Sequence, residues 1–246
     1  MSSTILFLIF LFLGPFSGGM IGLFVGKNLP KKYLKIWLAF SGAYLLALAM
    51  SNLMPHVFHE DYPHTGAFLL AGFLFQIILD YYSKGADHGH IHIDSHSHHE
   101  KNTVPHSLLA ALCLHSFIEG IPLGSDIMGT ESDKWSFLWG ISLHELPPAF
   151  VLISIYKSYA VKSNSIIFII ILYALMAPLG FSLSYILENG NILPEHILHY
   201  LLAIVTGTFL HISTTIIFES SENHRFNSVK LMMIILGISL ALLMTE

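Results

Sequence analysis

Eight apolar runs, each close to the length of a membrane-crossing helix, dominate this sequence of 246 residues. A helix needs about 20 predominantly apolar residues to cross the hydrocarbon core of a bilayer. The runs cover residues 5–25, 36–58, 65–82, 104–124, 135–156, 165–187, 198–218 and 229–244. Only 11% of the residues are charged, whereas soluble domains have about 25%. The sequence therefore predicts an all-α polytopic membrane protein whose single transmembrane domain fills residues 1–246.

The first run has an alternative interpretation, because a cleavable signal peptide is also apolar and N-terminal. Its opening residues, MSSTILFLIF, lack the positive segment that begins a signal peptide. The lysine cluster follows the run instead of preceding it. We therefore expect residues 5–25 to form a membrane span.

Positive charges gather on one side of the predicted spans. The odd-numbered connections share one side and hold ten of the eleven cations, namely Lys27, Lys31, Lys32, Lys35, Lys84, Lys101, Lys157, Lys162, Arg225 and Lys230. The other side holds Lys134 together with acidic residues such as Asp126, Glu131 and Glu188. The positive-inside rule predicts that the ten-cation side is cytoplasmic. We expect a plasma (inner) membrane protein with both termini outside, whose acidic outer face attracts cations and which does not bind nucleic acid.

Two short matches suggest an internal repeat. SGAYLLA at 41–47 aligns with TGTFLHI at 206–212, and GPFSGG at 14–19 aligns with APLGFS at 177–182. They pair the first three spans with the last three, and an odd number of spans per repeat gives inverted repeats. The prediction is a 3+2+3 arrangement in which the fourth and fifth spans stand unpaired in the middle.

The two middle spans carry the ionisable residues His115, Glu119, His144 and Glu145. A charged carboxylate at the bilayer centre costs about 2.5–3.5 kcal/mol even on the lenient insertion scale, so it needs a partner. His115 and Glu119 are four residues apart and project from one helical face. An imidazole with a carboxylate is half of a site for zinc or ferrous iron. Taken singly, each residue is explained as well by a structural polar contact.

His144 and Glu145 are adjacent and point about 100° apart on an ideal helix, because the helix has 3.6 residues per turn. They chelate in one plane only if the helix is distorted. The double proline at 147–148 leaves the carbonyls of Leu143 and His144 without their helical donors, and Pro122 does the same to Ile118 in the fourth span. We expect kinks whose bare carbonyls line a cation pathway, with ordinary membrane-helix kinks as the alternative.

These motifs resemble the ZIP (Zrt/Irt-like protein) family of divalent metal transporters. HSFIEG at 115–120 matches the family's His-x-x-x-Asp/Glu-Gly motif, and HELP at 144–147 matches its His-Glu-x-Pro motif. The resemblance implies eight spans, both termini outside and transport of a divalent cation into the cytoplasm. Zinc is the first expectation, with iron, manganese and cadmium as alternatives. The metal is then the transported substrate, no organic cofactor is implied, the chain is not an enzyme, and homodimerisation stays open.

The chain departs from family members that have a two-metal centre. Such members usually have Asn after the first His and a His or Glu four residues after the second, and some have a Glu before the sixth-span Pro. Here these places hold Ser116, Pro148 and Ala177. The resemblance therefore implies a single site formed by His115, Glu119 and His144. Glu145 is a fourth ligand or a neighbouring relay, and Ser116 is a further candidate at the second metal position.

The connection GADHGHIHIDSHSHHEKN at 85–102 contains the further candidate ligands His88, His90, His92, His96, His98 and His99. Its composition is typical of a disordered metal-binding segment, with chance low complexity as the alternative. In family terms it resembles a cytoplasmic metal-binding or sensing loop. We expect transport to survive its removal.

Polar residues also occur near the ends of two other spans. Residues 52–60, which include His56 and His59, end the second span on the outer side, where an entrance or a solvated helix end explains them equally well. His211 and residues 213–215 in the seventh span either line the pathway or bond to the backbone.

Two alternative functions use the same residues. An intramembrane zinc-dependent hydrolase is suggested because HELPP begins like the HExxH motif of zinc proteases, but Pro148 replaces the second His. A metal-gated sensor or channel shares every residue of the candidate site. Saturable uptake without hydrolysis separates a transporter from the hydrolase, and turnover rate and dependence on gradients separate a carrier from a channel.

Overall fold

The computed structural model describes all residues except 1, 27–30, 60–61, 84–105, 220–227 and 246. The His-rich segment 85–102 and Glu60 therefore lie outside the described residues. Within the described part, eight helices are long and apolar enough to cross a membrane. Their ends agree with the predicted runs to within four residues, so the prediction of eight long apolar helices is confirmed.

The described residues form helices and no strand. The first four spans are α1 (Ser2–Val25), α2 (Lys31–Leu48) continued by the π-helix η2 (Ala49–Leu53) and α3 (Met54–His59), α4 (Thr65–Ser83), and α5 (His106–Gly120). Two 3₁₀ turns follow, η4 (Pro122–Gly124) and η5 (Asp126–Met128). The last four spans are α6 (Glu131–Ser158), α7 (Ser163–Ala174) with α8 (Met176–Asn189), α9 (Glu195–Glu219), and α10 (Ser228–Thr245).

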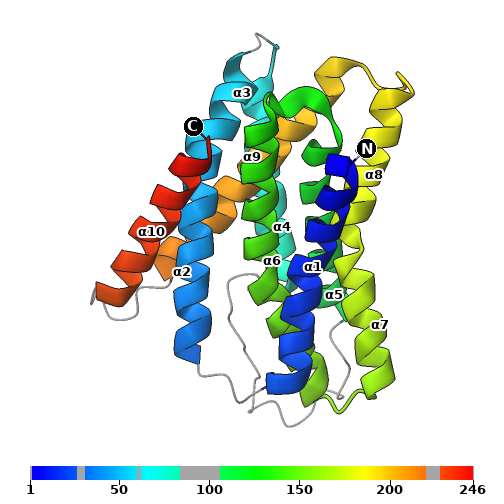
Figure 1. Cartoon of the computed structure of the whole chain (residues 1–246), viewed down its shortest axis with the longest axis vertical. Helices are drawn as coiled ribbons and strands as arrows, with labels where there is room; N and C mark the ends of the chain where they lie inside the picture. Colours follow the sequence, from blue (N-terminus) through cyan, green and yellow to red (C-terminus); the bar gives the residue numbers. More distant parts are fainter. Residues whose placement is uncertain (1, 27–30, 60–61, 84–105, 220–227, 246) are drawn as a thin grey trace.

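The helix packing follows the predicted 3+2+3 arrangement (Figure 1). The repeat pairs the first span with the sixth, the second with the seventh and the third with the eighth, and the same twofold relation exchanges the two middle spans, which belong to neither repeat. α1 packs against α6, and its counterpart α8 packs against α5. α4 packs against α9, and its counterpart α10 packs against α2. Each helix contact in one half of the bundle thus has its counterpart in the other half. Both termini lie at the same end of the bundle (Figure 1).

Glycines bring the helices around the middle pair into backbone contact. A Cβ added at Gly120 on α5 would lie 2.1 Å from the carbonyl oxygen of Ala177 on α8, and one at Gly180 would lie 1.9 Å from that of Phe117. Gly18 on α1 meets the Leu146 carbonyl of α6 in the same way. Small residues let membrane helices approach closely, so α5 and α6 are each clamped against a partner helix.

The two faces of α4 show how the bundle meets its surroundings. Leu70, Leu74 and Ile78, four residues apart, are 61%, 59% and 54% exposed and form a stripe suited to lipid. The opposite face carries a buried stripe that includes Gly72 and Gln76. The helical repeat that places the leucines on the exposed face of α4 therefore places Gln76 on its buried face.

The double proline does not interrupt the fifth span, because α6 is helical from Glu131 through Ser158. Pro147 leaves the Leu143 carbonyl without its helical donor. The indole Nε1 of Trp37, on α2, donates to this carbonyl at 3.0 Å. The sequence-based expectation of a bare carbonyl at Leu143 is therefore wrong, since a side chain 106 positions away in sequence replaces the missing donor.

Candidate metal centre

Three buried side chains from α5 and α6 converge on one point. One ligand atom from each of His115, Glu119 and His144 lies within 4.8 Å of the other two. His115 Nε2 is 3.1 Å from Glu119 Oε1 and 3.4 Å from His144 Nε2. The side chains are 2%, 0% and 0% exposed. The three predicted ligands are thus brought together at membrane depth.

The secondary structure explains this convergence. His115 and Glu119 lie one turn apart on α5, so both point to the same side. α6 supplies His144 opposite them, and the continuous helix holds that ring at a fixed rotation relative to α5. Gly120 follows Glu119 directly and packs against the backbone of α8, which fixes the C-terminal end of α5 at the site.

The chemistry of this trio suits a borderline divalent cation. Two imidazole nitrogens and one carboxylate oxygen are ligands that zinc accepts, usually in a tetrahedral arrangement. Three protein ligands leave a fourth position for water or another group. An ion held by these three residues would therefore not be fully enclosed by protein ligands.

Glu145 is fully buried but does not belong to the group of three. Its carboxylate lies close enough to interact with Ser116 and with Cys113, both on α5. Neither the Ser116 hydroxyl nor the Glu145 carboxylate has a hydrogen bond of ordinary geometry within the described residues. Glu145, rotated by about 100° from His144 on an ideal helix, therefore faces Ser116 and Cys113 of α5, and its role as a fourth ligand or a neighbouring relay stays a prediction.

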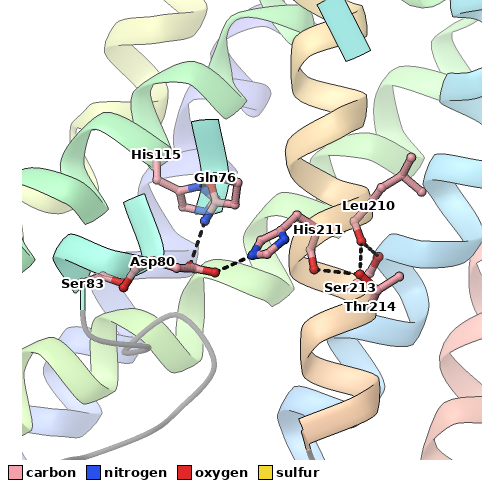
Figure 2. Close-up of polar contacts among 8 residues, drawn as sticks. All are labelled: Gln76, Asp80, Ser83, His115, Leu210, His211, Ser213 and Thr214. Carbon is pink, nitrogen blue, oxygen red and sulfur yellow. Dashed lines mark hydrogen bonds and ion pairs between the residues drawn. The ribbon is translucent and has the colours of Figure 1, made fainter. Parts of the chain in front are cut away.

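A chain of polar contacts leaves the trio toward α4 and α9 (Figure 2). His115 Nδ1 is 3.2 Å from Gln76 Oε1, and Gln76 Nε2 donates to Asp80 Oδ1 at 3.3 Å. The other Asp80 oxygen, Oδ2, is 2.5 Å from His211 Nε2. Sequence reasoning missed Gln76 and Asp80, although their spacing of four residues in an apolar run was a signal. For His211, the prediction left two alternatives open, and in the structure its side chain contacts Asp80 instead of the backbone.

The neighbouring hydroxyls of α9 bond to their own helix. Thr214 Oγ1 donates to the Leu210 carbonyl at 2.6 Å, and Ser213 Oγ donates to the same carbonyl at 3.2 Å (Figure 2). For these two residues the backbone-bonding alternative is the observed one. Side-chain bonds of this kind satisfy hydroxyls within an apolar helix.

At the other end of the bundle, a cavity of about 400 Å³ is lined by Pro55, His56, His59, Tyr62, Asp126, Ile127, Gly129 and His199. The Asn52 amide donates to the Asp133 carboxylate, and His56 Nδ1 donates to the Asn52 carbonyl at 2.9 Å. Asp133 also caps α6 through a reciprocal pair of bonds with Thr130. The polar end of the second span therefore borders a hollow in the protein, as an entrance requires, and it is tied to the start of α6.

Comparison with known proteins gives consistent matches. The family model for the ZIP Zinc transporter matches residues 83–245. Protein zntD of Dictyostelium discoideum is 25% identical over 166 residues, which are 63% of this chain and 24% of that protein. Zinc transporter 11 of Arabidopsis thaliana is 34% identical over 94 residues, 34% of this chain and 28% of that protein. The chain thus matches about a quarter of the length of these relatives, and the family match includes all of α5 and α6.

Proposed function

The chain belongs to the ZIP family of zinc transporters, and on this premise we propose that it carries a divalent cation, zinc first, through the site of His115, Glu119 and His144. The supporting observation is that two imidazoles and a carboxylate meet at a buried point of a membrane protein. Burying an ionised carboxylate is costly unless a counter-charge accompanies it. A bound divalent cation supplies that counter-charge.

The route that we propose begins at the outer cavity and ends on the cytoplasmic side of α4 and α9. The cation enters beside His56, exchanges water for the three ligands, and leaves toward the cytoplasm as the repeat helices rock against α5 and α6. The distribution of lysines supports an orientation with both termini outside, and in that orientation we propose inward transport across the plasma membrane. In this proposal Glu145 on α6 and Ser116 on α5, which lie close to each other, border the route.

The hydrolase alternative has weaker support. Pro148 occupies the position of the second histidine of an HExxH motif and lies buried within α6. The family to which the chain belongs is described as zinc transporters, and one relative bears the name Zinc transporter 11. We therefore take transport as the function.

The test is uptake of radiolabelled zinc into proteoliposomes that contain the purified protein. We expect saturable uptake that competing ferrous iron, manganese or cadmium reduces. His144→Ala and Glu119→Gln should abolish uptake because each removes one of the three ligands. His106→Ala is the matched control, since His106 is an exposed histidine at the start of the same helix α5. Equal uptake by all four proteins would overturn the proposed site, and no uptake by the wild type would overturn transport itself.

A further inference from the structure

Gln76 is an amide side chain buried completely within a membrane helix. It is 0% exposed and belongs to the buried stripe of α4. A buried amide without hydrogen bonds costs several kcal/mol in an apolar medium, so such a residue persists where it has partners. Gln76 has two partners in opposite directions, His115 on α5 and Asp80 one turn further along α4.

The Asp80 contact fixes which way the amide points. An ionised carboxylate accepts hydrogen bonds and does not donate them. The amide NH₂ group must therefore face Asp80 Oδ1, at 3.3 Å. The amide oxygen is then turned toward His115 Nδ1, at 3.2 Å. The orientation follows from the chemistry of the partners.

The amide orientation in turn fixes the tautomer of His115. An amide oxygen only accepts, so His115 Nδ1 must carry the hydrogen. In a neutral imidazole the other nitrogen, Nε2, then carries the lone pair. Nε2 is the nitrogen that lies 3.1 Å from Glu119 and 3.4 Å from His144. The lone pair therefore points into the trio, where a metal ion needs it.

We propose that Gln76 is a positioning residue of the metal site, which with Asp80 holds His115 in the tautomer and ring orientation that binds metal through Nε2. This inference rests on the proposed function. Hydrogen bonds to the second nitrogen of a ligating histidine orient the ring and raise its basicity as a ligand. An amide gives up a proton far less readily than a carboxyl group, so Gln76 orients His115 without opening a proton path to Asp80 and His211.

The test compares two substitutions that differ only in the acceptor. Gln76→Met keeps a similar length but offers His115 no oxygen. Gln76→Glu keeps the acceptor, and its carboxyl group, when protonated, also donates to Asp80 as the amide does. We expect Gln76→Met to weaken zinc binding by about 10- to 100-fold, the usual cost of losing an outer-shell partner, and Gln76→Glu to stay much closer to the wild type.

The measurement is the equilibrium dissociation constant of zinc for the purified full chain in detergent, by competition with a chromophoric chelator. The visible absorption of bound Co²⁺ is a second readout, because it responds to ligand orientation at the metal. Tyr44→Phe is the control, since it removes another buried side-chain donor, which bonds to the Ser136 carbonyl about two turns before His144 on α6. We expect it to lower stability while leaving the dissociation constant and the Co²⁺ spectrum unchanged.

The outcomes separate this inference from the proposed function. Wild-type binding with an unchanged dissociation constant and Co²⁺ spectrum in Gln76→Met would overturn the positioning role alone. An equal loss in Gln76→Met and Gln76→Glu would also overturn it, because the acceptor would not matter. Absence of zinc binding by the wild type would overturn the proposed function and this inference with it.

Discussion

The two middle helices, α5 and α6, accommodate a nearby proline in different ways. α5 and α6 each present site ligands and each meet proline within a few residues. α5 ends at Gly120, and the Ile118 carbonyl that Pro122 leaves free accepts from Ile121 N at 3.2 Å in a 3₁₀ turn. α6 continues for another 10 residues beyond Pro148.

The difference teaches that the effect of a proline depends on what replaces the missing donor. At Pro122 the chain itself supplies a donor by tightening into a turn, and the helix ends. At Pro147 a side chain from α2, Trp37, supplies it, and the helix goes on. A proline inside a membrane helix is tolerated when neighbours satisfy the freed backbone groups, and here the neighbour is a single indole.

The largest effect is expected from a substitution that disrupts the close packing of α5 against α8. Gly120→Ala places a Cβ 2.1 Å from the Ala177 carbonyl oxygen, so α5 and α8 must separate. We expect a loss of stability on the order of 3 kcal/mol or more, at the upper end of overpacking costs, and loss of zinc binding. Thermal unfolding in detergent measures this. Gly66→Ala is the control, because a Cβ at Gly66 meets nothing within 4 Å, and equal melting of both variants would contradict the clamp.

A smaller effect is expected from Trp37→Phe, which leaves the Leu143 carbonyl without its donor. A buried unsatisfied acceptor costs about 1–3 kcal/mol, and the loss falls on α6 beside His144. Equilibrium unfolding with a denaturing detergent measures the change in free energy. Trp139→Phe, an indole on α6 that packs against Phe10, is the matched control. If both changes cost the same, the Trp37 bond has no special role.

The smallest expected effect is the coupling between Trp37 and Pro147, which a double-mutant cycle measures. Pro147→Ala restores a backbone N–H that can donate to the Leu143 carbonyl. Trp37→Phe should then cost about 1 kcal/mol less in the Pro147→Ala background than in the wild type, as expected for two groups that serve one acceptor. Additive costs in the unfolding free energies would show that the indole and the proline are not coupled.

Much of the fold was predictable because membrane insertion depends on local hydrophobicity. A span is a run of side chains whose transfer into lipid is favourable, so its ends can be found from composition alone. The matches at 41–47 and 206–212 predicted the pairing of α2 with α9, which the helix packing follows. The spacing of His115 and Glu119 predicted their shared face.

The features that could not be predicted depend on contacts between distant parts of the chain. The donor of the Leu143 carbonyl comes from α2, and no local pattern around the double proline indicates it. The bond from Gln76 to His115 joins the third and fourth spans, and its existence requires the rotation of α4 about its axis. The π-helix η2, within which Asn52 reaches Asp133, leaves no clear mark in a hydropathy profile.

The most direct test of a shared site on α5 and α6 is zinc K-edge X-ray absorption of the purified protein with one zinc added per chain. We predict nitrogen and oxygen ligands with a clear imidazole contribution, and the loss of one imidazole from the zinc shell in His144→Ala. A sulfur ligand in the wild type, or identical spectra for the wild type and His144→Ala, would contradict the site.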